Sequence, residues 1–476
     1  MGIGNDILTG LGKGFFEAGS DFVNALVKSP HKRKEAYDSD FMPSHKLLNA
    51  ASDGFSLTGR ENLSALDSHM SCCVWGSPGQ GKSTCVAAPS IINLMKHGHS
   101  VAIFDPNNEL LPLVLGFSYK TGHHLKVIHY AKPDISDGYN PILRANDSSS
   151  IQKVASMLVR TSLGEGSKDP FWNAQSVLLL TLLIKVVKTY DKSLQHLTNV
   201  KLLLDHVVTG NMLDTIIAKT MDQEICQEWK QFLSLDKKML ISISSTCRAA
   251  LSIFTDPAVQ KITAFDTIDF ESFRVEPTLL AIQNPTGDTH YYQNLSALFF
   301  EQFFSSIMAE LPKREQKRSI FFVLDESGNL PLESLQVAAS TLRKFSSGLL
   351  LLAQDYSQYV HLHGAHKASA IKSCCFAHVY FPSQPLSTCI DLEKTLGKYE
   401  FKDENNTTKV RPLLSADEIR CLEKGTALIL TGNNPPIHAR MYPYYSSSNR
   451  NNYNLPYQDI PSKLPFTAVP LIPLPK

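Results

Sequence analysis

The sequence of 476 residues has little cysteine, and no two of its nine cysteines stand in a C-x-x-C spacing. Small secreted domains stapled by disulfides carry more cysteine at regular spacings, and structural zinc sites use paired cysteines. Neither pattern is present. The sequence therefore predicts reduced thiols and a cytoplasmic protein.

A strong excess of charge of one sign is also missing. Lysine and arginine number 46 and aspartate and glutamate 45, so the formal net charge is +1. This excludes a polycation that coats nucleic acid over its whole surface, and it leaves room for a local basic channel. Hydrophobic residues make up 43% and charged residues 19%, so the chain can build cores and is not disordered.

Long hydrophobic runs are absent as well, since no window approaches the ~20 unbroken apolar residues of a spanning helix. The richest run, Val177 to Val187, is interrupted by Thr181 and Lys185 and is short enough for a buried core helix. We expect no transmembrane segment. If the chain contacts a membrane, we expect it at the inner face of the cytoplasmic membrane.

Residues 1–50 are predicted to form an N-terminal arm, and residues 1–30 contain a helical pattern. Apolar residues recur there at steps of three or four, at Ile7, Leu11, Phe15, Ala18, Phe22 and Leu26, as on one face of a helix. Two interpretations stay open. The helix either packs on its own domain or docks on a membrane surface or a partner protein.

Short apolar runs bounded by turn signals predict buried strands of a parallel sheet. The predicted strands are Ser71–Trp75, Val101–Phe104, Lys126–His129, Thr278–Ile282, Ser319–Leu324, Gly348–Ala353, His378–Phe381 and Ala427–Leu430. Strand signals vanish between about 150 and 260. That stretch instead predicts helices over Asn173–Lys188, Asn199–Val208, Asn211–Thr220 and Gln223–Leu233.

A phosphate-binding loop follows the first predicted strand, because Gly76–Ser83 fits G-x-x-x-x-G-K-[ST] between a strand and a helix. Its glycines let backbone N–H groups turn toward phosphate oxygens at a helix N-terminus. Lys82 can reach the β- and γ-phosphates, Ser83 can bind Mg²⁺ and Thr84 can donate to the α-phosphate. The predicted ATP-binding residues are Gly76, Ser77, Pro78, Gly79, Gln80, Gly81, Lys82, Ser83 and Thr84.

An acidic pair ends a second apolar strand, Phe321–Leu324, as in a Walker B motif. We expect Asp325 to hold Mg²⁺ together with Ser83, and Glu326 to polarise the attacking water. Lys82 and Asp325 stand 243 positions apart. Most simple P-loop folds place these motifs much closer, so the spacing favours an inserted domain.

These patterns predict a nucleotide-binding domain of the α/β class, divided by an all-α insertion. The predicted parts are residues 51–153 and 263–440 for the nucleotide-binding domain, 154–262 for the insertion and 441–476 for an extended Pro-rich tail. Two further catalytic candidates lie downstream. Arg343 could stabilise charge on a γ-phosphate held by a neighbouring subunit, and Gln354 at a strand tip could sense that phosphate. From chemistry alone, each is as easily structural.

The sequence resembles the type IV secretion coupling proteins, which are conjugation-type hexameric ATPases. The resemblance covers residues ~70–435 and rests on the order of several short motifs. Besides the two Walker elements they are Asp105–Glu109, Tyr139–Ile142, Trp172, Phe254–Pro257, Leu330-Pro331, Gln354–Gln358 and Gly364. This sequence departs from the family in two ways. Family members usually begin with transmembrane helices, which we do not expect here. Where the family has the element Asp-Pro-Lys-Gly-Glu, this sequence has Asn107 and Asn108 in place of Lys-Gly.

The resemblance implies a RecA-type P-loop domain with the helical domain inserted, and a homo-hexameric ring with ATP and Mg²⁺ at each interface. It implies ATP hydrolysis that feeds DNA, DNA–protein complexes or effector proteins into a secretion channel. Relaxases, effectors and channel components would be partners. Arg343 falls where the family has an arginine finger.

Two alternatives stay open. The first is a DNA translocase or helicase of the related hexameric class that acts without a channel. The second is a non-catalytic adaptor that binds nucleotide and recruits substrates.

Overall fold

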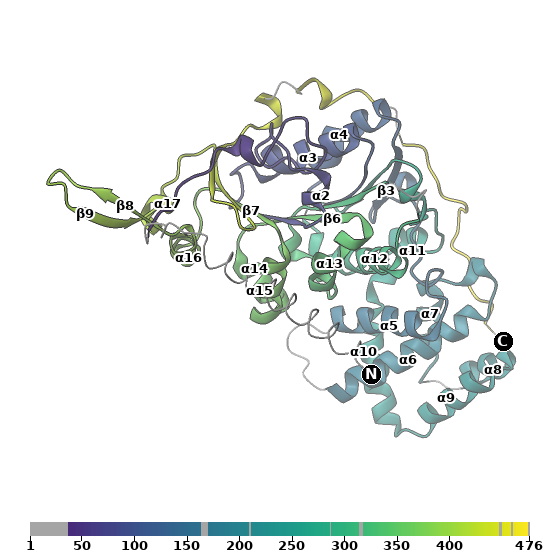
Figure 1. Ribbon diagram of the computed structural model, residues 1–476. Coiled ribbons are helices and arrows are strands. Elements are labelled where there is room, and N and C mark those ends of the chain that lie inside the picture. Colours follow the sequence, from purple (N-terminus) through teal and green to yellow (C-terminus); the bar gives the residue numbers. More distant parts are fainter. Residues whose placement is uncertain are drawn as a thin grey trace, which may run out of the picture.

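The structure is a computed structural model that describes residues 37–162, 170–208, 211–285, 287–313, 318–446, 450–457 and 460–474. The amphipathic helix predicted within residues 1–30 lies outside these ranges. Figure 1 shows a central sheet with helices on both faces and a helical segment at one end.

The described residues form one sheet of nine strands in the order β11-β10-β7-β1-β6-β5-β2-β4-β3. The strands are β1 (Cys72–Trp75), β2 (Ser100–Asp105), β3 (His124–His129), β4 (Thr278–Gln283), β5 (Ile320–Leu324), β6 (Ser347–Ala353), β7 (Ala377–Tyr380), β10 (Thr426–Thr431) and β11 (Ile437–Arg440). From β7 to β3 neighbouring strands run parallel, whereas β10 pairs antiparallel with both β7 and β11. The carboxyl ends of the parallel strands therefore meet at one edge.

Both faces of this sheet are covered, which explains why its strands are almost continuously apolar. In β1, Cys72 and Val74 belong to the core on one face, and Cys73 and Trp75 belong to the core on the other. The first core includes residues of α3 (Ala88–Lys96) and α4 (Leu110–Lys120). The second includes residues of α12 (Thr289–Ala309), α13 (Leu335–Thr341), α14 (Tyr356–His363) and α15 (Ala365–Cys374).

Helices fill the stretch between β3 and β4, without a strand among the residues described there. They are α5 (Ser148–Ser162), α6 (Pro170–Lys188), α7 (Leu197–Leu204), α8 (Asn211–Thr220), α9 (Gln223–Leu233), α10 (Lys237–Ala250) and α11 (Pro257–Thr263). Four of them match the predicted helices to within three or four residues. The domain boundaries predicted from the sequence stay predictions.

Within the described residues, one helix passes the length and hydropathy test for a membrane span, at Phe171–Lys188. Half of that window is buried inside the protein. Leu180, Leu183 and Val187 are fully buried, and α6 contacts α5, α7, α9 and α10. Packing in the helical segment therefore accounts for the apolar character of α6.

Three strands of the structure are not predicted from the sequence. The hairpin β8 (Lys398–Lys402) and β9 (Thr408–Pro412) forms its own two-stranded sheet and projects from the molecule (Figure 1). Its residues are exposed or half-buried, so they lack the apolar pattern that marks a core strand. β11 was missed because it is a four-residue edge strand with alternating burial.

The tail after β11 runs over α4 and on to the helical segment (Figure 1). The Asn454 N–H donates to the Leu113 carbonyl at 2.9 Å, and Lys463 Nζ lies 2.6 Å from the buried Asp137 carboxylate. Farther on, the Ile472 N–H donates to Asn199 Oδ1 at 3.1 Å. The tail therefore joins the two parts of the protein.

Candidate nucleotide site

The phosphate loop connects β1 to the π-helical turn η2 (Lys82–Ala87), which continues into α3. Gly79 and Gly81 have φ of 75° and 106°, a region that L-residues with side chains rarely adopt. A Cβ at Gly81 would lie 3.0 Å from Cys85 Sγ, and one at Gly76 would lie 2.8 Å from Phe381 Cβ. The glycines of the motif thus meet both a conformational and a steric requirement.

The remaining loop residues surround this turn. Ser77 Oγ donates to the Ser383 carbonyl at 3.4 Å, and Thr84 Oγ1 donates to the Gly81 carbonyl at 3.3 Å. Pro78 is exposed and Gln80 is half-buried. The loop is therefore fixed at its ends, while its tip faces outward.

The Lys82 side chain reaches back to the start of the loop. Its amine donates to the carbonyls of Gly76 at 2.6 Å and Ser77 at 3.4 Å. Burial lowers the pKa of Lys82, and the carboxylates of Asp325 and Glu326 oppose that shift. The amine is thus held next to the loop, where it can exchange a carbonyl for a phosphate oxygen.

Ser83 and Asp325, which lie far apart in the sequence, meet at the edge of the sheet. Ser83 Oγ donates to Asp325 Oδ2 at 3.2 Å. Strand β6 pairs with both β1 and β5 and so brings Asp325 close to the phosphate loop. On the other side of β5, the Asp325 N–H donates to the Phe104 carbonyl of β2 at 3.1 Å.

Asp325 is 3% exposed. Burial raises its pKa to about 7, with repulsion from Asp105 and Glu326 adding to the effect and Lys82 and Ser83 opposing it. Lys82 and Ser83 therefore compensate only part of the cost of burying this carboxylate. A hydroxyl and a carboxylate are hard oxygen ligands of the kind that Mg²⁺ prefers, so Ser83 and Asp325 fit that ion.

Glu326 has an unusual backbone conformation at φ 50° and ψ 39°. Two amides hold its carboxylate, since Asn107 Nδ2 donates to Oε1 at 3.0 Å and Asn329 Nδ2 donates to Oε2 at 3.3 Å. A left-handed non-glycine residue at such a point is typical of functional sites. The two amides give Glu326 a fixed orientation.

Asn107 is a site residue that the sequence motifs do not predict, because the family element has a lysine at this position. Its position depends on Asp105, whose buried carboxylate accepts the backbone N–H groups of Glu109, Leu110 and Leu111 at 2.9–3.2 Å. Asp105 thereby caps the start of α4. A short polar side chain after a strand-ending aspartate was the available signal.

Gln354 and Arg343 lie at opposite ends of β6. Ala353 pairs with Trp75, and the Gly76 N–H donates to the Ala353 carbonyl at 3.2 Å, so Gln354 stands beside the start of the phosphate loop. Arg343 precedes β6 in the turn η8 (Leu342–Phe345) and is exposed. Seven strand residues at about 3.3 Å each separate the two by roughly 20 Å.

The geometry thus brings the phosphate loop, Asp325, Glu326 and Gln354 together and leaves Arg343 at the other edge. The family described as "Type IV secretory system Conjugative DNA transfer" matches residues 32–466. The chain belongs to that family. The resemblance inferred from the short motifs is confirmed.

Two curated relatives illustrate the match within this family. Protein VirD4 of Agrobacterium fabrum (strain C58 / ATCC 33970) is 23% identical over 227 residues, which cover 44% of this chain and 34% of that protein. The probable conjugal transfer protein TraG of Sinorhizobium fredii (strain NBRC 101917 / NGR234) is 20% identical over 394 residues, 76% of this chain and 60% of that protein. The matched stretch thus spans between a third and three fifths of these relatives.

Solved structures agree on the fold. Unbound TrwBdeltaN70, a bacterial conjugative coupling protein, superposes with a TM-score of 0.68 at 17% identity, covering 86% of this chain and 95% of that one. TrwB in complex with the non-hydrolysable GTP analogue GDPNP gives 0.67 at 17% identity, covering 86% and 96%. The predicted α/β, RecA-type P-loop fold with a mostly parallel sheet is therefore confirmed.

Proposed function

We propose that this chain is an ATP-hydrolysing coupling protein of type IV secretion. One observation carries the proposal: Ser83 Oγ lies 3.2 Å from Asp325 Oδ2, so two distant motifs form one site of hard oxygen ligands beside Lys82. Related structures hold TrwB in complex with ADP and Mg²⁺ and with a non-hydrolysable ATP analogue. Membership of the conjugative DNA transfer family supports the same function.

In this proposal the loop N–H groups and Lys82 hold the β- and γ-phosphates, and Thr84 donates to the α-phosphate. Ser83 and Asp325 hold Mg²⁺, which would supply positive charge against the phosphate oxygens. Glu326, fixed by Asn107 and Asn329, orients the attacking water and polarises it. Gln354 stands where it can sense the γ-phosphate.

Lys82 provides the direct test. We expect Lys82→Ala to lower ATP turnover by a hundredfold or more, since the loss removes a preorganised positive charge at the transferred phosphate. Lys96→Ala is the matched control, because Lys96 is exposed at the end of α3, the helix that follows the loop. Normal turnover by the Lys82 variant would refute the proposal.

The proposed homo-hexameric ring gives Arg343 a role at the interface between two subunits. Arg343 lies roughly 20 Å along β6 from the phosphate loop, too far to reach a phosphate in its own subunit, so we propose that it serves the site of a neighbouring subunit. We expect Arg343→Ala to retain nucleotide binding and lose turnover. Mixing inactive Lys82→Ala and Arg343→Ala subunits should restore part of the activity, because some interfaces then combine an intact lysine with an intact arginine. Mixed rings without any recovery would contradict this role.

The proposed cargo is DNA, DNA–protein complexes or effector proteins, delivered to a secretion channel with relaxases or effectors and channel components as partners. The cytoplasmic location, and contact with the inner face of the cytoplasmic membrane through residues 1–30, stay predictions. Turnover measured with and without single- and double-stranded DNA, together with binding to a relaxase, distinguishes this function from a translocase that acts alone. Retained function in Glu326→Gln would favour an adaptor.

A further inference from the structure

Arg343 lies on a single helical turn, η8, that ends in a residue of unusual conformation. Leu342 and Phe345 are buried, whereas Arg343 and Lys344 between them are exposed. The Ser346 N–H donates to the Arg343 carbonyl at 3.1 Å, and Ser346 is left-handed at φ 49° and ψ 46°. Because so short a turn forms few internal hydrogen bonds, its last carbonyls need donors from elsewhere in the chain.

Arg274 supplies those donors. It is the last residue of η6 (Ser272–Arg274), which precedes β4. Its guanidinium donates to the Phe345 carbonyl, to the Ser346 carbonyl at 3.2 Å and to Ser347 Oγ at 3.1 Å. All three acceptors stand at the end of η8 or directly after it, so one side chain from a distant part of the sequence holds the end of the turn.

The surroundings of Arg274 make this attachment rigid. The side chain is 7% exposed, and a further bond joins it to the Arg318 carbonyl at 3.1 Å. Burial lowers the pKa of Arg274 to about 10, so the guanidinium stays charged at neutral pH. Hydrogen bonds from a charged donor are stronger than neutral ones, and the planar fork of arginine fixes the direction of its acceptors as well as their distance.

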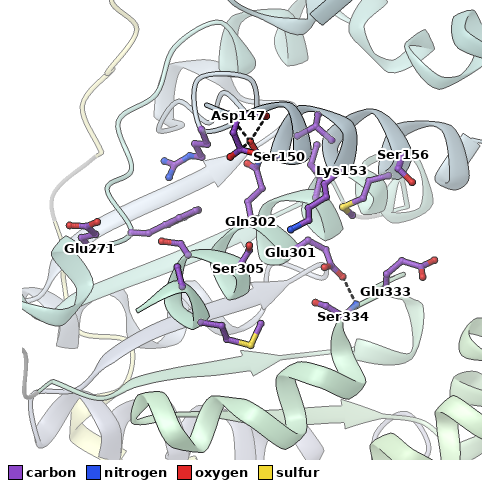
Figure 2. A pocket seen from close by; sticks show the side chains of 18 of the residues that line it. Asp147, Ser150, Lys153, Ser156, Glu271, Glu301, Gln302, Ser305, Glu333 and Ser334 are labelled. Atoms are coloured by element: carbon purple, nitrogen blue, oxygen red, sulfur yellow. Dashed lines mark hydrogen bonds between the residues drawn. The ribbon is translucent and has the colours of Figure 1, made fainter. Parts of the chain in front are cut away.

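The segment that leads to Arg343 is also held at its start. Ser334 precedes α13, and α13 runs directly into η8. Glu301 of α12 accepts the Ser334 N–H at 2.8 Å, a bond drawn in Figure 2 beside the cavity between α5 and α12. The segment is therefore fixed by Glu301 at one end and by Arg274 at the other.

We propose that Arg274 is a positioning residue, which orients η8 so that Arg343 reaches the γ-phosphate held by a neighbouring subunit. The inference rests on the proposed role of Arg343 and adds a residue that belongs to none of the sequence motifs. Arg274 contacts the start of β6, roughly 20 Å along that strand from the phosphate loop of its own subunit. Its loss should therefore leave nucleotide binding in that subunit unchanged.

Arg274→Gln tests this role in the full chain with ATP as substrate. We expect kcat to fall by about tenfold to a hundredfold and KM to stay within about twofold, since a misplaced catalytic group weakens binding of the transition state alone. Arg318→Gln is the matched control. Its guanidinium donates to the carbonyls of Gly98 and Val275, which lie outside η8, so this variant should keep the kcat of the wild type.

Mixing two variants separates positioning of Arg343 from a general loss of structure. An Arg274→Gln subunit keeps its own nucleotide site, and a Lys82→Ala subunit keeps an intact Arg343 turn. Mixed rings contain interfaces that combine these two intact parts. The mixture should therefore turn over more ATP than the two proteins give separately. If Arg274 supported the nucleotide site of its own subunit instead, each site in the mixture would lack one essential residue and no recovery would follow.

Arg274→Lys keeps the charge but replaces the fork by one nitrogen, so its kcat should lie between those of Arg274→Gln and the wild type. Circular dichroism checks folding, and the lysine variant carries the same comparisons if the glutamine variant does not fold. Loss of turnover in Arg343→Ala together with normal kcat in Arg274→Gln would overturn the inference and leave the proposed function standing, as would mixed rings without recovery. Normal turnover in Lys82→Ala would instead refute the proposed function itself.

Discussion

Asp325 is placed to bind Mg²⁺, and we predict that its buried carboxylate destabilises the folded protein when no Mg²⁺ is bound. Its pKa of about 7, against an ordinary value of 3.8, means that the folded protein keeps the proton over a range in which the unfolded chain has lost it. Each pH unit of such a shift corresponds to about 1.36 kcal/mol. Ionised Asp325 therefore destabilises the fold by up to about 4 kcal/mol above pH 7.

The sign of the pH dependence follows from proton binding. Between about pH 4 and pH 7 the folded state binds more protons at this residue than the unfolded state does. The free energy of unfolding must therefore fall as the pH rises through that window. Asp325→Asn removes this dependence while it retains an acceptor for Ser83. The free energy of unfolding of Asp325→Asn, relative to that of the wild type, should therefore be higher at pH 8 than at pH 5 by about 3 kcal/mol.

Urea unfolding followed by circular dichroism measures the free energy of unfolding of the wild type and of Asp325→Asn at pH 5 and at pH 8, without Mg²⁺ and nucleotide. The prediction concerns how the difference between the two proteins changes from pH 5 to pH 8. Effects that do not depend on pH cancel in the comparison. Asp391→Asn is the control, because Asp391 is exposed on α16 (Leu386–Leu396). Asp325→Asn should also lose ATP turnover, whereas the Asp391→Asn control should keep it. An equal stability difference between Asp325→Asn and the wild type at both pH values would refute the argument.

Two further predictions concern the loop and the tail. Gly81→Ala should weaken binding of a fluorescent ATP analogue by tenfold or more, because φ is 106° and the new Cβ meets Cys85 Sγ at 3.0 Å. Gly122→Ala, at φ 71° with nothing within 4 Å, should bind normally, and equal effects would contradict the steric argument. Ile472→Ala should speed proteolytic cleavage of the tail, since a 3% exposed side chain loses roughly 2 kcal/mol of packing. Leu471→Ala, 54% exposed, should not, and similar cleavage of both would refute the role of the tail as a tether.

The predicted core strands correspond to strands of the sheet, with ends that differ by one or two residues. Buried parallel strands such as Phe321–Leu324 are marked by unbroken apolar runs between turn signals, so local sequence is sufficient to find them. Polar or very short strands carry no such signal. The hairpin β8–β9 and the edge strand β11 are held by backbone pairing, which depends on a partner strand rather than on side-chain pattern.

The sequence by itself determined the phosphate loop and the acidic pair, because the chemistry of holding phosphate and Mg²⁺ restricts which residue types can stand at adjacent positions. Only the tertiary structure decided what supports them. That Asn107 orients Glu326 follows from strand order, which brings together residues 219 positions apart. No local pattern encodes that order, because it results from the packing of the whole chain.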